Sequence, residues 1–354
     1  MQLSLFGIET SGVRRLIHTI SSFDPGPAGP IGPNPVIEHL LLFAVGLTSL
    51  TLGADWLVTG AARVAAQRGV SPLMVGLTIV AFGTSAPELV VSSAAALRGE
   101  SGLAIGNIMG STVANVGLIV GLGAMIRPIA VHRRLIRTES PLLIGFLAAV
   151  LLLAADGYVD RVDGMLLLSG FGFYLYYLFR WGHASEGTDE VLSAEVETAK
   201  KKGDPAGRRP WLNWARVFLG MVLLLIGANW LVDSAIVIAR VFDVPEEVIG
   251  ATLVAVGTSV PELASTIAAA IRGLGDIAIG NVIGSNIFNL GLVLGTASVI
   301  HPLGLSRFAV QAEVLPALAF CLVLIPLAYT GARVSRAEGG LLLAGYALFI
   351  FSVL

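Results

Sequence analysis

Two glutamates that recur inside long apolar segments are the residues of this sequence best suited to chemistry. Residues 83–88 read Gly-Thr-Ser-Ala-Pro-Glu and residues 257–262 read Gly-Thr-Ser-Val-Pro-Glu, so Glu88 and Glu262 have matching surroundings. An ionisable side chain at the centre of a bilayer costs at least about 2.5–3.5 kcal/mol, so each must face an internal polar or hydrated site. Two carboxylates held close repel each other unless a cation or a proton joins them. A cation is the natural partner, since Ca²⁺ binds about six to eight oxygens.

A second signature follows each glutamate motif at the same distance. Residues 106–115 and 280–289 both begin with Gly-Asn and continue with Gly-Ser, and one offset of 174 residues relates both pairs of motifs. Each contains a serine and an asparagine four residues apart, which puts a hydroxyl and an amide on one helix face. These pairs are Ser111 with Asn115 and Ser285 with Asn289.

The prolines of the first signature indicate a further source of oxygen ligands. Pro87 and Pro261 lack an N–H and clash with the carbonyl four residues back, so carbonyls in that turn lose helical partners. Such carbonyls are tolerated at membrane depth where they line a cavity or are buried in protein. The same turns carry hydroxyls on Thr84, Ser85, Thr258 and Ser259. This set has no soft or nitrogen donors, which disfavours zinc and copper.

Each of these residues also has a structural interpretation. The serine of each glutamate motif and the glutamate three residues later fit a capping box. The serines and asparagines of the second signature fit hydrogen bonds between helices. For Asn107 and Asn281 we favour that structural role. Asp55 is replaced by Asn229 in the second copy, so it is the weaker site candidate, and we expect it to hydrogen-bond near a span end.

The composition indicates a polytopic membrane protein. Hydrophobic residues make up 55% of the chain and charged residues 13%, with a mean hydropathy of +0.83, whereas soluble domains carry about 25% charged residues. Cys321 stands alone, which excludes a disulfide framework and a cysteine metal site. Polar and Pro/Gly punctuation separates ten apolar runs, near 37–66, 72–97, 102–124, 138–156, 163–180, 212–240, 246–271, 276–299, 309–329 and 339–354.

These runs predict two five-helix repeats. We expect an N-terminal extension at 1–36, a first repeat at 37–181, a polar cytoplasmic connector at 182–210 and a second repeat at 211–354. Five spans is an odd number, so the second repeat enters the membrane inverted, the architecture of many secondary transporters. Most of the Lys and Arg residues fall on the connector's side, which places both termini outside.

With its four motifs in this order, the chain from residue 37 onward resembles the cation/calcium antiporter superfamily. Gly-Thr-Ser before Pro-Glu resembles the sodium/calcium exchangers, in their prokaryotic type. The resemblance implies an all-α membrane fold of ten transmembrane helices, built as two inverted five-helix repeats, that exchanges Ca²⁺ for several Na⁺. It implies calcium ligation by Glu88 and Glu262 with the carbonyls of Thr84 and Thr258.

For sodium the resemblance implies a larger set of ligands. Its members are Ser85, Ser259, Ser111, Ser285 and the carbonyls of Ala81 and Ala255, with Asn115 and Asn289 in the middle of the site. The chain departs from the family at two positions. Several relatives, including potassium-dependent exchangers, carry Asp where this chain has Asn289, which argues against potassium cotransport. Residues 110–112 read Gly-Ser-Thr, so Thr112 stands where the family usually has the Asn of Gly-Ser-Asn.

We therefore expect a secondary antiporter of a bacterial or archaeal inner membrane that exchanges Ca²⁺ for Na⁺ by alternating access, electrogenically and without potassium. No enzymatic activity, cofactor, nucleic acid or obligate protein partner is expected, because the motifs contain no nucleophile and base pair, phosphate-binding loop or histidine-rich site. The alternatives are a proton-coupled exchanger of Ca²⁺ or another divalent cation, since carboxylates also carry protons, and a cation channel.

Overall fold

The computed structural model describes residues 35–68, 70–131, 135–181, 210–242, 255–306, 309–329 and 332–353. The predicted extension 1–36 and connector 182–210 lie outside these residues, except where 35, 36 and 210 begin helices. The first part of the predicted span 246–271 also lies outside them. The described chain is mostly helical, as expected.

In the first half, helical segments coincide with the predicted spans, and two short strands lie between them. These elements are α2 (Pro35–Arg68), α3 (Pro72–Val75), π-helix η1 (Gly76–Val80), α4 (Ala81–Thr84), α5 (Ala86–Leu97), α6 (Ser101–Ala114), π-helix η2 (Asn115–Val120), α7 (Gly121–Ile126), β1 (Ile129–Ala130), π-helix η3 (Leu135–Glu139), α8 (Ser140–Leu153), 3₁₀-helix η4 (Ala154–Asp156), β2 (Tyr158–Val159) and α9 (Arg161–Trp181).

The second half contains a similar order of elements. They are α12 (Pro210–Val241), α14 (Ala255–Gly257), α15 (Val260–Ile271), α16 (Gly275–Phe288), π-helix η6 (Asn289–Val293), α17 (Leu294–Ile300), β3 (Leu303–Gly304), π-helix η7 (Val310–Val314), α19 (Leu315–Tyr329), β4 (Arg333–Val334) and α20 (Arg336–Val353).

Within the described residues, seven helices are long and apolar enough to span a membrane. An eighth span results if the pair Pro72–Thr84 and Ala86–Leu97, which is bent by 47°, is counted as one. The helices α15 and α20 overlap the two remaining predicted spans. The chain is therefore an integral membrane protein.

Each glutamate motif breaks a helix and starts a new one. Ser85 (φ −82°, ψ 7°) separates α4 from α5, and Ser259 (φ −89°, ψ 4°) precedes α15. Pro87 and Pro261 follow within the first turn, where a missing N–H costs nothing because those amides have no intrahelical partner. Glu88 and Glu262 consequently lie in the first turn of their helices.

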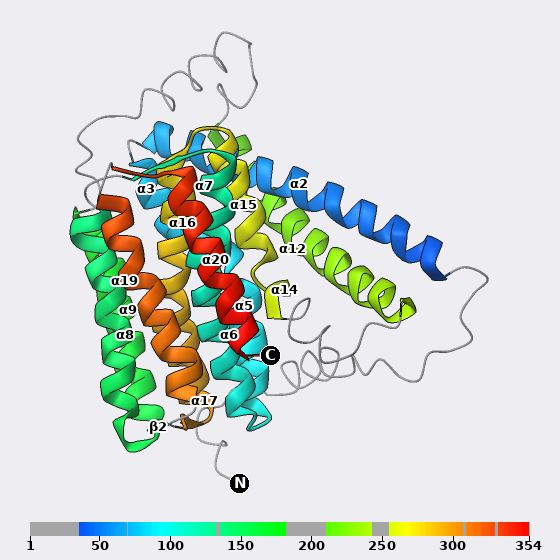
Figure 1. The fold of residues 1–354 in the computed structure, drawn as a ribbon. Coiled ribbons are helices and arrows are strands. Elements are labelled where there is room, and N and C mark those ends of the chain that lie inside the picture. The colour runs from blue at the N-terminus through cyan, green and yellow to red at the C-terminus, as the bar shows by residue number, and fades with distance from the viewer. Residues whose placement is uncertain are drawn as a thin grey trace, which may run out of the picture.

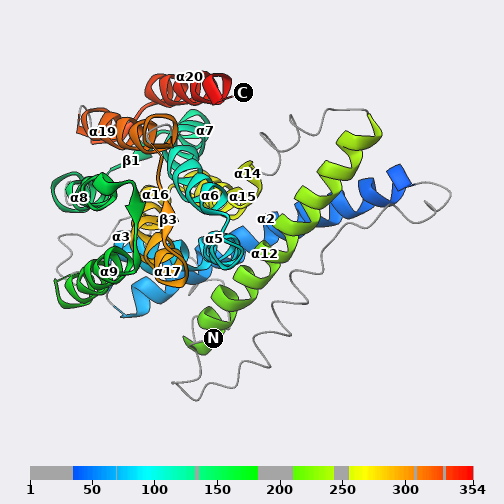
Figure 2. The ribbon, with the colours of Figure 1, turned by 90° about the horizontal axis from the view of Figure 1, so that it is seen from below.

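The helices α6 and α16, with their continuations, form the buried centre of the bundle. The most apolar stretch of the span Gly275–Ile300 is 94% buried, and that of the span Ser101–Ile126 is 78% buried. Figure 2 shows α16 surrounded by the other helices of the bundle. The second signatures therefore lie in the core of the protein.

The long helices α2 and α12 pack against each other and lie obliquely at one side of the bundle (Figures 1 and 2). Their backbones approach closely at glycines. A Cβ added to Gly53 would lie 2.5 Å from the backbone nitrogen of Leu224, so no larger residue fits there without moving a helix.

Two short antiparallel sheets join the halves at opposite ends of the bundle (Figure 1). In one, β1 pairs with β4, with Ile129 opposite Val334. In the other, β2 pairs with β3, with Val159 opposite Leu303. Each sheet thus ties a loop of the first half to a loop of the second.

Candidate ion-binding site

The two glutamates are buried and take hydrogen bonds from both halves of the chain. Each is 1% exposed. Glu88 Oε1 accepts hydrogen bonds from the hydroxyls of Ser111 and Ser259, both at 3.4 Å. Glu262 Oε1 accepts one from Ser85 at 3.1 Å. The serine next to each helix break therefore serves the glutamate of the opposite half.

Each glutamate keeps one oxygen without a hydrogen-bond partner. The Oε2 atoms of Glu88 and Glu262 are buried and accept no hydrogen bond within the part of the chain that the structure describes. A buried charge is costly unless it is paired or coordinates a metal. These two oxygens are therefore suited to bind a cation, because a positive ion would pair with the buried negative charge of the carboxylates.

The capping-box interpretation is wrong for this chain. The side chains of Ser85 and Ser259 make no capping hydrogen bond to the helices that they precede. Their hydroxyls donate to carboxylates across the interface between the halves instead.

Asn107 and Asn281 hold the glutamate helices in place, which confirms their structural role. Asn107 Nδ2 donates to Ser92 Oγ at 2.9 Å and to the Glu88 carbonyl at 3.5 Å. Asn107 Oδ1 accepts from the Thr258 hydroxyl at 3.2 Å. This asparagine therefore connects the α5 and α6 helices of the first half to the turn before α15.

The second half contains the same arrangement with more bonds. Asn281 Nδ2 lies 3.0 Å from both Ser265 Oγ and Thr266 Oγ1 and 3.4 Å from the Glu262 carbonyl. Asn281 Oδ1 accepts from the Thr84 hydroxyl at 3.2 Å. The two predicted threonines thus direct their hydroxyls to asparagines, and Thr84 Oγ1 also lies 3.5 Å from Ser285 Oγ.

The two asparagines of the second signature differ in their contacts. Asn115 and Asn289 begin the π-helices η2 and η6 and are fully buried. Asn115 Nδ2 donates to Asn286 Oδ1 at 2.8 Å, and its own Oδ1 accepts no hydrogen bond within the described ranges. Neither polar atom of Asn289 has a hydrogen-bond partner there. Both asparagines therefore present a buried amide oxygen that has no hydrogen-bond partner among the described residues.

The predicted alanine carbonyls belong to the helices just before the breaks. The Ala81 carbonyl accepts hydrogen bonds from the Ser85 amide at 2.9 Å and from Thr84 Oγ1 at 3.3 Å. Ala255 is the first residue of α14. The Ala81 carbonyl therefore has hydrogen-bond partners within its own turn.

Several buried or partly buried polar residues escaped the sequence analysis. Ser92, Thr266 and Asn286 belong to the hydrogen-bond networks described above. Glu139 and Glu313 are acidic residues of the π-helices η3 and η7, and Glu139 is fully buried. The 174-residue offset relates Ser92 to Thr266 and Glu139 to Glu313, so the repeat itself was the signal that could have found them.

A cavity of about 430 Å³ lies beside the site, between α5 and α12. Thr258 and Pro261 line it from the second glutamate motif, and Asn229 and Asp233 line it from α12. At the related position on the other side, α2 packs against α15. The site is therefore approached by a cavity from one side of the bundle.

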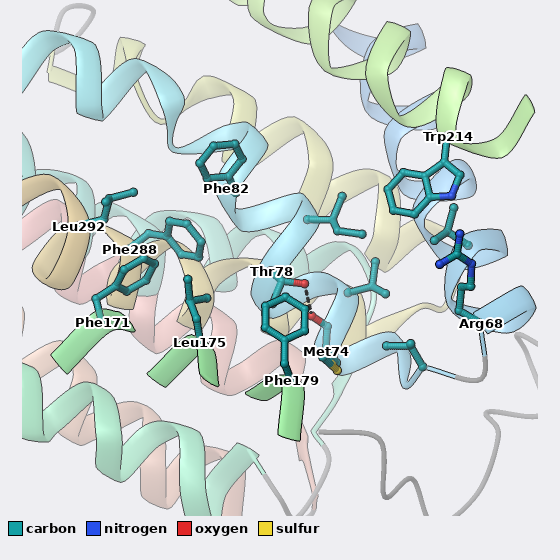
Figure 3. A pocket seen from close by; sticks show the side chains of 14 residues that line it. Arg68, Met74, Thr78, Phe82, Phe171, Leu175, Phe179, Trp214, Phe288 and Leu292 are labelled. Atoms are coloured by element: carbon teal, nitrogen blue, oxygen red, sulfur yellow. Dashed lines mark hydrogen bonds between the residues drawn. The ribbon is translucent and has the colours of Figure 1, made fainter. Parts of the chain in front are cut away.

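A second cavity, of about 740 Å³, is apolar and does not suit a cation (Figure 3). Arg68 is the one charged residue among the described residues that line it, and its guanidinium lies 5.8 Å from the Trp214 ring. Figure 3 shows the aromatic side chains of Phe82, Phe171 and Phe288 around it. The hydroxyl of Thr78 donates to a helix carbonyl. The described residues that line this cavity therefore offer a cation no acidic ligand.

The described residues contain no group of three or more His, Cys, Asp or Glu side chains that could hold a metal ion. Two carboxylates surrounded by hydroxyls and amides remain. Such oxygen ligands suit hard cations such as Ca²⁺. A site with only two charges also suits an ion that must bind and leave.

Comparisons with known proteins agree on one family. The sodium/calcium exchanger protein family matches residues 38–180 and again residues 212–354, at the same offset as the motifs. The chain is 33% identical over 347 residues to the sodium/calcium exchanger MaX1 of Methanosarcina acetivorans, covering 89% of this chain and 98% of that protein. It is 36% identical over 263 residues to the inner membrane protein YrbG of Escherichia coli, covering 74% and 79%.

A solved structure is also similar. The sodium-calcium exchanger NCX_Mj superposes with a TM-score of 0.76 at 34% sequence identity. The match covers 90% of this chain and 99% of that one. The likeness therefore extends over both halves of the chain.

Proposed function

Because this chain belongs to the sodium/calcium exchanger family, we propose that it exchanges Ca²⁺ for Na⁺ as a secondary antiporter that works by alternating access. The family transports cations and does not catalyse covalent chemistry. One observation carries the proposal: Glu88 and Glu262 are buried, and each has one unpartnered oxygen and one oxygen that accepts a hydrogen bond from a serine of the opposite half. The partners of the site are the transported ions, with no cofactor.

The charge of the site couples the two ions. Two carboxylates match one Ca²⁺ or two Na⁺, so either load neutralises the pair. Without a load, two buried negative charges repel each other in a region of low dielectric constant. That state is costly to carry through a closed intermediate, which favours exchange over leak.

We assign the ligands as follows. Ca²⁺ binds Glu88 and Glu262 with the carbonyls of Thr84 and Thr258. The sodium ligands are Ser85, Ser259, Ser111, Ser285 and the carbonyls of Ala81 and Ala255, with Asn115 and Asn289 between them. If a further Na⁺ binds these neutral oxygens, transport moves net charge. Asn289 adds no charge of its own, so we propose that potassium is not cotransported.

We further propose ten transmembrane helices arranged as inverted repeats, 37–181 and 211–354, joined by a cytoplasmic connector at 182–210. Three observations support the repeats: the common offset, the double match to the family, and the paired breaks at Ser85 and Ser259. With both termini outside, the cavity between α5 and α12 opens to the external side. The relative YrbG is named an inner membrane protein, which supports that location here.

The test is calcium uptake into proteoliposomes loaded with sodium, compared with potassium-loaded and pH-jumped vesicles. We expect uptake only with an outward sodium gradient, and we expect Glu88→Gln and Glu262→Gln each to abolish it. Glu100→Gln, which alters an exposed carboxylate outside the site, is the matched control. Sodium-independent flux that survives both glutamate substitutions would reject the site.

The proton-coupled alternative uses the same observation, because an unpartnered carboxylate oxygen can also carry a proton. In that case a pH gradient alone drives uptake into vesicles without sodium. A cation channel would pass calcium down its gradient without an opposing ion. The vesicle comparison therefore separates all three mechanisms.

A further inference from the structure

We propose that Asn286 is a positioning residue that fixes the orientation of the Asn115 amide in the ion site, and that Thr112 leaves the related Asn289 without such a partner. The two halves of the site then contribute unequally to ion binding. This inference rests on the proposed function and assigns different roles to two ligands that the repeat makes equivalent.

The contacts of Asn286 form a short chain. Asn286 Nδ2 donates to the backbone carbonyl of Thr112 at 3.5 Å, which directs Asn286 Oδ1 toward the neighbouring helix. Asn115 Nδ2 donates to that Oδ1 at 2.8 Å. Asn286 is 0% exposed and Asn115 1%, so water does not compete for these bonds. The orientation of one amide therefore sets that of the next.

The orientation of an amide matters because its two ends differ. The oxygen can bind a cation, whereas the NH₂ group is a donor that repels one. With its NH₂ group held by Asn286, Asn115 presents an oxygen that has no hydrogen-bond partner among the described residues. Asn286 thus makes Asn115 a ready acceptor before any ion arrives.

The related residue in the first half cannot do the same for Asn289. The 174-residue offset relates Asn286 to Thr112 and Asn115 to Asn289. The Thr112 hydroxyl donates to the Ile108 carbonyl of its own helix at 2.9 Å. Both polar atoms of Asn289 lack a hydrogen-bond partner within the described chain, and the residue is 0% exposed.

The consequence is a division of roles between the two asparagines. A ligand held in its bound orientation loses less conformational entropy on binding than a ligand that must first be ordered. Asn115 is such a ligand, whereas the ion itself must orient Asn289. Loss of Asn286 should therefore weaken ion binding through Asn115 and through no other residue.

The alternative is that Asn286 only packs α16 into the core. In that case, its substitution lowers the stability of the fold whichever residue occupies position 115. A double-mutant cycle separates these roles, because a residue that acts through Asn115 has no effect once Asn115 has been replaced.

The experiment measures the calcium KM and maximal rate of sodium-driven uptake for the native chain, Asn286→Leu, Asn115→Ala and the double variant. We expect Asn286→Leu to raise KM about three- to tenfold, the equivalent of one hydrogen bond, with little change in maximal rate. In the Asn115→Ala background it should have no further effect. Calcium-induced thermal stabilisation of the purified protein gives a second reading of affinity.

Two variants complete the test. Ser298→Ala removes a buried hydroxyl that donates to Leu294 in α17, away from the site, and should leave KM unchanged. Thr112→Asn installs at the related position a side chain that can hold Asn289, and we expect a lower sodium KM. This variant tests the inference even where Asn286→Leu fails to fold.

The outcomes distinguish this inference from the proposed function. Absence of sodium-driven uptake by the native chain would reject the function itself. Normal exchange with an unchanged KM in Asn286→Leu, or an equal rise in KM with and without Asn115, would overturn the positioning role alone. An unchanged sodium KM in folded Thr112→Asn would overturn the role assigned to Thr112.

Discussion

Asp55 of α2 forms an ion pair with Arg272, the residue that follows α15, and the Arg272 Nε atom lies 2.9 Å from Asp55 Oδ1. The 174-residue offset relates these residues to Asn229 and Arg98. Asn229 carries no charge and lines the cavity between α5 and α12. The ion pair thus joins α2 to α15, whereas a cavity occupies the related position between α12 and α5. In the proposed mechanism, the ion pair holds α2 against α15 and so keeps that side of the ion site closed.

Asp55→Asn removes the charge and makes the two sides alike. The side chains are 33% and 42% exposed, so screening by solvent limits the effect to that of a surface pair, about 0.2–1 kcal/mol. We expect α15 and the middle of α2 to open more often, by about 1.5- to fivefold. Hydrogen exchange of the peptides that cover these segments measures the change.

The reciprocal substitution is the control for this prediction. Asn229→Asp introduces a carboxylate at the related position of α12, where Arg98 is the related cation. This substitution should slow hydrogen exchange in the α5 and α12 peptides without slowing it in the α15 peptides. The effect of Asp55→Asn should also shrink at high salt. Unchanged exchange of α15 in Asp55→Asn at low salt would show that the pair does not hold the closed side.

Cation binding should stabilise the protein against heat, and the glutamates should be required for it. A ligand that binds only the folded state at one hundred times its Kd adds about 2.7 kcal/mol. Calcium and sodium should therefore each raise the Tm of the purified protein relative to choline, which is too large for the site. We expect Glu88→Gln and Glu262→Gln to lose most of the calcium effect.

The control for the thermal measurement is again Glu100→Gln, which should respond to calcium as the native chain does. The glutamine variants should themselves be at least as stable as the native chain without ions, because each removes one of two mutually repelling buried charges. Full calcium stabilisation in either glutamine variant would contradict the ligand assignment.

The repeated motifs made much of the fold and site predictable. The spans and the breaks at Ser85 and Ser259 follow from apolar runs and prolines, which are local signals. The membrane location and the family follow from the same residues. Roles in ion binding remain predictions, because they depend on ions and not on the chain alone.

Partners across the halves could not be predicted from local signals. The pattern at Ser85 fits a capping box, yet its hydroxyl donates to Glu262, which lies 177 residues away. Asp55 likewise gives no local sign of Arg272. The start of π-helix η2 at Asn115 also escapes a pattern of apolar residues, because η2 is buried on nearly every side and its sequence shows no periodicity. Tertiary packing decided each of these features.

The contact between α2 and α12 should not tolerate a side chain at Gly53. The Cβ of Gly53→Ala would lie 2.5 Å from the Leu224 nitrogen, which belongs to a backbone that cannot move alone. The helices must separate, at a cost of about 1–3 kcal/mol for overpacking. We expect a lower Tm and slower exchange of Ca²⁺ for Na⁺. Gly172→Ala in α9 is the matched control, because nothing lies within 4 Å of its added Cβ. Equal Tm values for the two variants would refute this packing argument.

The last prediction compares Asn281 with Asn107. Asn281 is fully buried and its NH₂ group reaches two hydroxyls and the Glu262 carbonyl, whereas Asn107 is partly buried and reaches one hydroxyl and the Glu88 carbonyl. Leaving buried partners unsatisfied costs about 1–3 kcal/mol. Asn281→Leu should therefore lower the Tm more than Asn107→Leu. Both should weaken calcium binding, because each asparagine holds the backbone of a glutamate. If Asn107→Leu proves the more destabilising, the hydrogen bonds of Asn281 are not what anchors α15.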